Sequence, residues 1–283
     1  MNVLFIGATG LVGSHTAPLL AEKFALTCTG LKEGQLAGLP VQPLDICDWD
    51  ATASFIQNGT NGGEAFDAVI YCATANYHHI RMGDAEERRR YYEQCIEVNM
   101  RGAYHVFEAA WRADVSRVVH IGSMTSIMGY PRYESIDTET RDRPNDLYAA
   151  TKIFGEHVGR SYAFRKPPSG QQMKVICLRL AQPTAADDLR TQQWIAHSHY
   201  TAMAVDMRDI ALAMECALTT EVQYGVYPLV SGADEPYVDP QAYAELGYVP
   251  QWKYVFTEDK RVEIHRHDPQ ATAAVVPSKL PLP

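Results

Sequence analysis

The sequence lacks the features of several protein classes. No apolar run approaches the roughly 20 residues that a membrane-spanning helix needs, so we expect no such helix. The first residues, MNVLFIG, carry no basic stretch, and we expect no signal peptide there. Six cysteines are scattered without CxxC spacing, which argues against a bound metal and for a reduced, cytoplasmic protein.

Basic residues are fewer than acidic residues. Lys and Arg total 25 against 34 Asp and Glu, which gives a net charge of −9. Nucleic acids and anionic membranes attract the opposite sign, so we expect neither as a partner. Hydrophobic residues make up 46% of the 283 residues. This share excludes a disordered chain and allows a sizeable core.

Apolar runs of strand length alternate with segments of helical periodicity. Because nearly every position in these runs is apolar, they are typical of strands buried on both faces of a parallel sheet. The predicted strands are 2–6, 25–29, 67–72, 117–121, 174–180 and 224–230, and the predicted helices are 11–23, 86–111 (one long helix), 146–164 and 206–218. This order predicts an α/β protein with a doubly wound parallel sheet, the Rossmann fold.

A turn-forming segment at 166–170, KPPSG, interrupts this alternation. We therefore predict a nucleotide-binding Rossmann domain at 1–165, to which residues 203–230 return. Residues 166–202 and 231–283 would form a small, discontinuous C-terminal substrate lobe and tail. The tail from about residue 268 is rich in Pro and Ala, and we expect it to be poorly packed or to reach a partner subunit.

A glycine-rich loop, GATGLVG, follows the first strand at once and opens the first helix. Gly7 permits a tight turn, Gly10 lets the backbone approach a pyrophosphate, and Gly13 lets the helix close on the sheet. The helix N-terminus offers N–H groups and a positive dipole end to the phosphates. The whole loop, with Thr9, Leu11 and Val12, is predicted to bind a dinucleotide.

The second strand runs into Gly30, where an NAD-specific site usually carries an acidic residue for the ribose 2′-OH. Gly30 leaves room there, and Lys32 could offset the charge of a 2′-phosphate. The cofactor is thus NAD or NADP, and this segment favours NADP, although Glu33 could still serve NAD.

Tyr148 and Lys152 form a Y-x-x-x-K motif. Residues four apart share one face of a helix, so the phenol and the ammonium can point at one ligand. An ammonium beside a phenol favours the phenolate, which would let a group of reference pKa about 10 exchange protons near neutrality. Lys152 would also hydrogen-bond the nicotinamide ribose.

These motifs, in this order, resemble the extended short-chain dehydrogenase/reductase superfamily, also called the NAD-dependent epimerase/dehydratase family, over about residues 1–180. The segments DICD at 45–48, VIYCAT at 69–74 and EVNMRG at 97–102 resemble family segments as well. The resemblance implies that Asp45 and Ile46 hold the adenine and that Asn99 braces the central helix. Cys72, Ala73 and Thr74 would pass beneath the cofactor ribose.

The family carries a serine or threonine that hydrogen-bonds the reacting substrate oxygen. Counted from the strand at 117–121, this residue is Ser123. Counted backward from Gly129, the position falls on Met124, so the segment carries one extra residue. The strand end fixes the geometry, and we therefore predict Ser123, with Thr125 in reserve.

Several strings look most like the uronate dehydrogenase branch. LYAATKIFGE at 147–156 resembles its catalytic helix, and DLRTQQW at 188–194 resembles the segment whose arginine grips the sugar carboxylate. Arg190 is therefore the predicted substrate anchor, since a guanidinium binds a carboxylate through two parallel bonds. Met124 and Thr125 stand where that branch has an Asn-His pair, which weakens the uronate assignment. Thr74, Ser123 and Thr125 complete the predicted substrate contacts.

The resemblance predicts an NAD(P)-dependent oxidoreductase acting on a hydroxyl or carbonyl of a small sugar or sugar-acid-like molecule. Tyr148 would take the hydroxyl proton while the hydride moves to the nicotinamide. Two alternatives remain open: a sugar or sugar-nucleotide epimerase that retains its cofactor, and a non-catalytic NADP-sensing regulator. In the family the helices at 86–111 and 146–164 often pair across a dimer, so we expect a homodimer.

Overall fold

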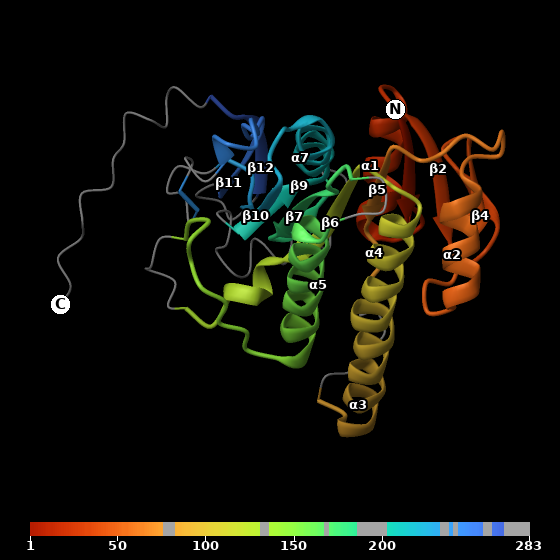
Figure 1. Cartoon of the computed structure of the whole chain (residues 1–283). Helices are drawn as coiled ribbons and strands as arrows, with labels where there is room; N and C mark the ends of the chain where they lie inside the picture. Colours follow the sequence, from red (N-terminus) through yellow and green to blue (C-terminus); the bar gives the residue numbers. More distant parts are fainter. Residues whose placement is uncertain are drawn as a thin grey trace.

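The computed structural model describes residues 1–75, 83–130, 136–166, 170–185, 203–232, 238–239, 243–256 and 262–268. An eight-stranded sheet of order β10-β7-β6-β5-β1-β2-β4-β3 forms its centre (Figure 1). Neighbouring strands pair in parallel throughout, except in the β3–β4 hairpin. The fold is therefore the predicted doubly wound α/β fold. The chain reverses its direction across the sheet between β1 and β5, where such sheets bind ligands at the carboxyl ends of the strands.

The strands of this sheet are β1 (Asn2–Ile6), β2 (Ala25–Gly30), β3 (Gly34–Leu36), β4 (Leu39–Pro43), β5 (Ala68–Tyr71), β6 (Arg117–Ser123), β7 (Lys174–Leu180) and β10 (Tyr224–Leu229). The helices are α1 (Leu11–Ala21), α2 (Trp49–Asn58), α3 (Ala85–Gln94), α4 (Gly102–Arg112), α5 (Leu147–Phe164) and α7 (Met207–Thr219). None of the helices in the described ranges is long and apolar enough to cross a membrane.

The sheet is covered on both faces, which explains its continuous apolar strands. In β1, Val3 and Phe5 join a core shared with α1 and α7, while Leu4 and Ile6 join the core shared with α2, α4 and α5. Successive side chains of a strand point to opposite faces, so all four are buried only because helices lie on both sides. In Figure 1, α4 and α5 run side by side against the sheet.

The long helix predicted at 86–111 is interrupted. A seven-residue π-helical segment, η1 (Cys95–Arg101), separates α3 from α4 without ending the helical run. A π turn holds about one residue more than an α turn. The spacing of apolar residues in the sequence does not show where such a turn begins, so the sequence predicts one continuous helix. Such π turns are often found at functional sites, and Asn99 lies in this one.

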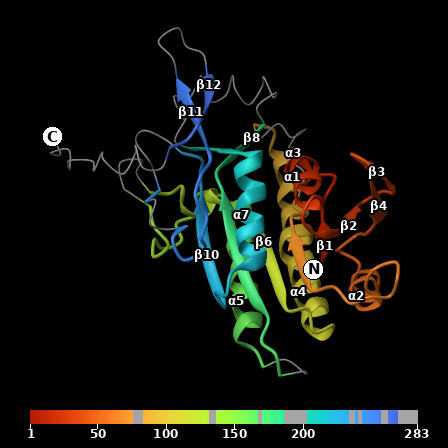
Figure 2. The same cartoon turned by 90° about the horizontal axis from the view of Figure 1, so that it is seen from above.

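Residues after β7 add two small sheets outside the main one. The strands β8 (Gln182–Thr184) and β9 (Ala204–Asp206) pair in parallel, and β11 (Trp252–Phe256) and β12 (Val262–Arg266) form an antiparallel hairpin. Figure 2 shows this hairpin projecting from the molecule beyond β10, while β10 itself adds to the edge of the main sheet.

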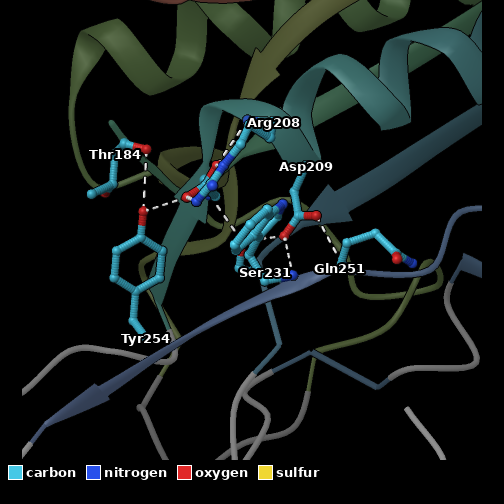
Figure 3. Close-up of polar contacts among 8 residues, drawn as sticks. Thr184, Arg208, Asp209, Ser231, Gln251 and Tyr254 are labelled. Carbon is cyan, nitrogen blue, oxygen red and sulfur yellow. Dashed lines mark hydrogen bonds and ion pairs between the residues drawn. The ribbon is translucent and has the colours of Figure 1, made fainter. Parts of the chain in front are cut away.

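A buried polar cluster fastens the hairpin to the N-terminus of α7 (Figure 3). Asp206 accepts bonds from Arg208 Nε at 2.7 Å and from Tyr254 Oη at 2.9 Å. Asp209 accepts from the Gln251 backbone N–H at 2.8 Å and from the Ser231 hydroxyl at 2.6 Å. Both carboxylates are essentially inaccessible to solvent. The hydrogen bonds from these donors offset the free-energy cost of removing the carboxylates from water.

Candidate active site

The glycine loop forms a cradle that only glycine can build. Gly7 has φ +87°, and a Cβ there would lie 2.6 Å from the Ala73 backbone nitrogen. A Cβ at Gly13 would lie 2.4 Å from the Gly7 carbonyl oxygen. Gly10 precedes α1 and brings no capping side chain, so the N-terminus of this helix is open to a phosphate. The loop thus fits a dinucleotide at the ends of β1 and β5, where Thr9, Gly10 and Leu11 are exposed.

The end of β2 lies directly beside this loop. A Cβ at Gly30 would be 2.6 Å from Thr9 Oγ1, so the Thr9 side chain fills the space that a larger residue would need. Lys32 and Glu33 are both exposed just beyond. The Asp45 carboxylate accepts from the Cys47 backbone N–H at 2.9 Å, and Ile46 is buried under Gly102.

Tyr148 lies near the N-terminus of α5, which Asp146 caps by accepting from the Ala149 N–H at 2.7 Å. The hydroxyl groups of Thr74, after β5, and Ser123, at the end of β6, interact with its phenol. Burial raises the pKa of Tyr148 to about 12, and the two hydroxyls oppose that rise. In the protein alone, therefore, the phenol does not have the lowered pKa that the lysine spacing predicted, because desolvation outweighs the favourable contacts.

Lys152 is 3% exposed, and its ammonium donates to the Ile121 carbonyl at 3.0 Å. Its Nζ lies 6.0 Å from the centre of the Tyr148 ring. Burial lowers the pKa of Lys152 to about 8, and Cys72, Cys95 and Glu156 act in the opposite direction. The Y-x-x-x-K pair thus lies at the end of β6, with Lys152 buried and Tyr148 half-buried.

Asn99 joins three elements around this pair. Its Oδ1 accepts from Thr74 Oγ1 at 3.0 Å and from the Ala75 N–H at 3.1 Å, and its Nδ2 donates to Thr151 Oγ1 at 3.1 Å. Thr151 in turn donates to the Tyr148 carbonyl at 2.8 Å. The π segment therefore holds the end of β5 against the turn of α5 that carries Tyr148.

Met124 and Thr125, the alternatives to Ser123 as the hydroxyl residue of the family, lie in different surroundings in the loop after β6. Met124 is buried in the core, at 2% exposure. Thr125 lies beside Ser123, to whose Oγ it donates at 2.9 Å. The segment Met124–Ile127 (η2) is a short 3₁₀ helix that Ser123 caps. Arg190, the predicted substrate anchor, lies outside the described residues.

One aromatic neighbour of the site is not predictable from the sequence. The Tyr91 ring of α3 stacks on the Tyr148 ring with centroids 6.3 Å apart, and Tyr91 is 3% exposed. Tyr91, Cys95 and Ala75 form a small apolar cluster against Tyr148. The run EERRR at 86–90, just before Tyr91, is typical of a charged helix surface, and no local pattern shows which of the two following tyrosines turns inward. No group of three or more metal-binding side chains gathers within the described part of the chain.

Comparison with known proteins agrees with this geometry. Residues 3–224 match the model of the NAD dependent epimerase/dehydratase family. The chain is 28% identical over 268 residues to L-arabinose 1-dehydrogenase (NAD(P)(+)) of Haloferax volcanii, which covers 88% of this chain and 96% of that protein. It is also 29% identical over 112 residues to a uronate dehydrogenase of Agrobacterium fabrum, and this match covers 40% of this chain and 41% of that protein.

Solved structures agree on the fold. A mutated uronate dehydrogenase superposes with a TM-score of 0.70 at 24% identity, over 88% of this chain and 81% of its own. A uronate dehydrogenase variant from Agrobacterium tumefaciens complexed with NAD gives 0.69 at 21% identity, over 88% and 84%. The matched region contains the glycine cradle, Ser123 and the Y-x-x-x-K helix. The chain therefore belongs to the NAD dependent epimerase/dehydratase family and is an NAD(P)-dependent enzyme of the extended short-chain dehydrogenase/reductase type.

Proposed function

We propose that the protein is a dehydrogenase that oxidises a hydroxyl group of a small sugar or sugar acid, or reduces the corresponding carbonyl. The observation that carries this proposal is the convergence of Tyr148, Ser123 and Lys152 at the carboxyl end of β6, beside the glycine cradle. The Haloferax volcanii relative, named for L-arabinose and matched over nearly its whole length, supports a sugar substrate.

The mechanism assigns one task to each residue. The Ser123 hydroxyl forms a hydrogen bond with the reacting substrate oxygen. In the oxidation, Tyr148 takes the proton of the substrate hydroxyl as general base. The nicotinamide, when bound, supplies the hydride acceptor. Lys152 keeps two further N–H donors beyond the one it gives to Ile121, which suit the nicotinamide ribose. Its positive charge stabilises the phenolate that Tyr148 must form, against the burial that raises its pKa to about 12.

The cofactor we propose is NAD or NADP, with NADP preferred. No carboxylate side chain extends from the end of β2, because position 30 is a glycine and Thr9 fills the space beside it. Lys32 stands exposed within the same turn. The Thr9 hydroxyl and the Lys32 ammonium would suit a 2′-phosphate, whereas the exposed Glu33 beside them would instead suit the 2′-OH of NAD.

The test is absorbance of reduced nicotinamide during incubation with a panel of aldoses and uronic acids, with each cofactor. Wild-type protein should accumulate reduced cofactor with one substrate class, and Tyr148→Phe should lose turnover but still bind cofactor. A fully active Tyr148→Phe would refute the mechanism. Substrate conversion without net cofactor reduction would instead favour the epimerase alternative.

We also propose a homodimer formed by the helices at 86–111 and 146–164. Exposed apolar side chains on these helices include Ile96, Tyr104 and Phe164, which a partner would cover. Light scattering should give about twice the 31.6 kDa chain mass. Ile96→Glu should reduce this to the mass of one chain, and a wild-type protein that already has that mass would contradict the proposal.

A further inference from the structure

A buried ion cluster that the proposed mechanism does not use lies under the active site. The guanidinium of Arg179, on β7, donates through Nε to Glu156 Oε1 at 2.9 Å and through Nη2 to Glu156 Oε2 at 2.6 Å. Nη2 also donates to Asp142. The side chains of Arg179 and Glu156 are 8% and 3% exposed. An ion pair this well buried need not stabilise the fold, because apolar residues of similar volume often give an equal or larger free energy of unfolding.

The cluster touches the catalytic elements at three places. The first is helix α5, on which Tyr148, Lys152 and Glu156 follow at intervals of four residues and so share one face. The carboxylate of Glu156 therefore lies one turn beyond the ammonium of Lys152. Removing it would remove the negative charge nearest to Lys152 along its own helix.

The second contact is the end of β6. Gly122 pairs in register with Arg179, and Ser123 is the next residue. A Cβ at Gly122 would lie 3.0 Å from Glu156 Oε1 and 3.4 Å from Arg179 Cγ. The ion pair thus packs directly across the backbone that presents the Ser123 hydroxyl, and only a glycine leaves it that space.

The third contact is the segment that leads into α5. Next to Asp142, the Arg143 N–H donates to the Ser126 carbonyl at 2.8 Å and the Arg143 carbonyl accepts from the Gly129 N–H at 2.9 Å. Asp146 then caps α5. Arg179 therefore connects the catalytic helix, through Glu156, with the loop that packs against the turn after Ser123.

Titratable side chains from several of the elements packed against it surround Lys152. Cys72 after β5 and Cys95 in the π segment face it, as does Glu156, and all three favour the ammonium; the buried His120 of β6 also lies close to it. Both thiols have a raised pKa, to about 12 and about 11. Burial raises the pKa of Glu156, and the bidentate contact with the Arg179 guanidinium opposes that rise by favouring the carboxylate.

We propose that Glu156 and Arg179 are positioning residues of the active site: together they fix α5 against the end of β6, and Glu156 sustains the Lys152 ammonium. The inference rests on the proposed function, because it assumes that charged Lys152 is needed for turnover. A purely structural pair would affect stability but not the protonation of Lys152.

The experiment compares Glu156→Gln with Glu108→Gln. Glu108 is a matched control, since it is a buried carboxylate of α4 paired with Arg112 and Arg165, at the opposite end of α5 beside Tyr162. Two readouts are followed: the pH profile of kcat/KM, and the pH titration of the Lys152 Nζ by ¹⁵N-lysine NMR, assigned with Lys152→Arg. We expect Glu156→Gln to move the Lys152 titration and the alkaline limb of the profile down by about one pH unit. Glu108→Gln should move neither.

A double variant, Glu156→Met with Arg179→Met, keeps the inference testable if the single variant does not fold. Replacing both charges removes the unpaired buried charge, so its melting temperature should stay closer to wild type than that of either single variant. The downward shift of the Lys152 titration should nevertheless persist. A folded double variant that titrates as wild type would overturn the inference.

The two proposals fail in distinguishable ways. An active Tyr148→Phe removes the proposed function itself, whatever the NMR titration shows. An inactive Tyr148→Phe, together with an unshifted Lys152 titration in Glu156→Gln, removes only the role of Glu156 and Arg179.

Discussion

The Tyr91 ring stacks on the Tyr148 ring with an interplanar angle of 22°, although the two residues lie on different helices. Tyr91 comes from the last turns of α3, just before the π segment. The stack therefore links the course of that helix to the direction in which the proposed catalytic phenol points.

Loss of this stack should slow turnover. Tyr91→Leu removes an aromatic contact of about 0.5–1.5 kcal/mol, which corresponds to a fall in kcat of roughly two- to tenfold if it acts on the transition state. Tyr91→Phe keeps the ring and should retain most of the activity. Tyr104→Leu, on an exposed position of α4, is the control. Equal kcat values for Tyr91→Leu and wild type would show that the stack does not position Tyr148.

Asn99→Ala should destabilise the protein and lower activity together. The substitution removes the acceptor of the buried Ala75 N–H and the donor to the Thr151 hydroxyl, at a cost of about 1–3 kcal/mol. Thermal unfolding should shift down by roughly 2–5 °C. Asn58→Ala, at the exposed end of α2, should change the melting temperature much less. An unchanged melting temperature for Asn99→Ala would contradict the bracing role.

Lys32→Ala should weaken NADP binding selectively. Loss of one exposed cation opposite a 2′-phosphate costs about 1 kcal/mol, so the Kd for NADP should rise about fivefold while that for NAD stays within about twofold. Gly30→Asp should act in the same direction and more strongly, through charge repulsion and contact with Thr9. Titration of intrinsic tryptophan fluorescence measures both constants. Parallel changes for the two cofactors in Lys32→Ala would rule out a role in selectivity.

Asp209 should make stability depend on pH in mildly acidic solution. Burial raises its pKa from 3.8 to about 6, so between these values the folded protein binds more protons than the unfolded chain. The contribution of this group to the free energy of unfolding therefore falls as pH rises from about 4 to about 6, by about 2–3 kcal/mol in total. Asp209→Asn should flatten this part of a urea-denaturation series, whereas the exposed Asp50→Asn should leave it unchanged. A slope equal to wild type in Asp209→Asn would mean that another group causes it.

Much of the fold was predictable because strands buried on both faces leave a strong local pattern. The predicted strands at 2–6 and 174–180 have the bounds of β1 and β7. Strands β3 and β8 were missed, since three residues carry no period. The hairpin β11–β12 was missed as well, because Trp252 and Tyr254 contact Arg208, Asp209 and the α7 cap Asp206, which are distant in the sequence.

By itself, the sequence determined the glycine cradle, the Y-x-x-x-K helix and the serine at the strand end, because each follows from neighbouring residues and a fixed helical or strand period. Only the tertiary structure decided which other side chains meet them. Tyr91 reaches Tyr148, and Arg179 reaches Glu156 and Asp142, across separations that no local pattern encodes. Burial likewise sets the protonation of Tyr148 and Lys152, since desolvation depends on what the rest of the chain packs around a charge.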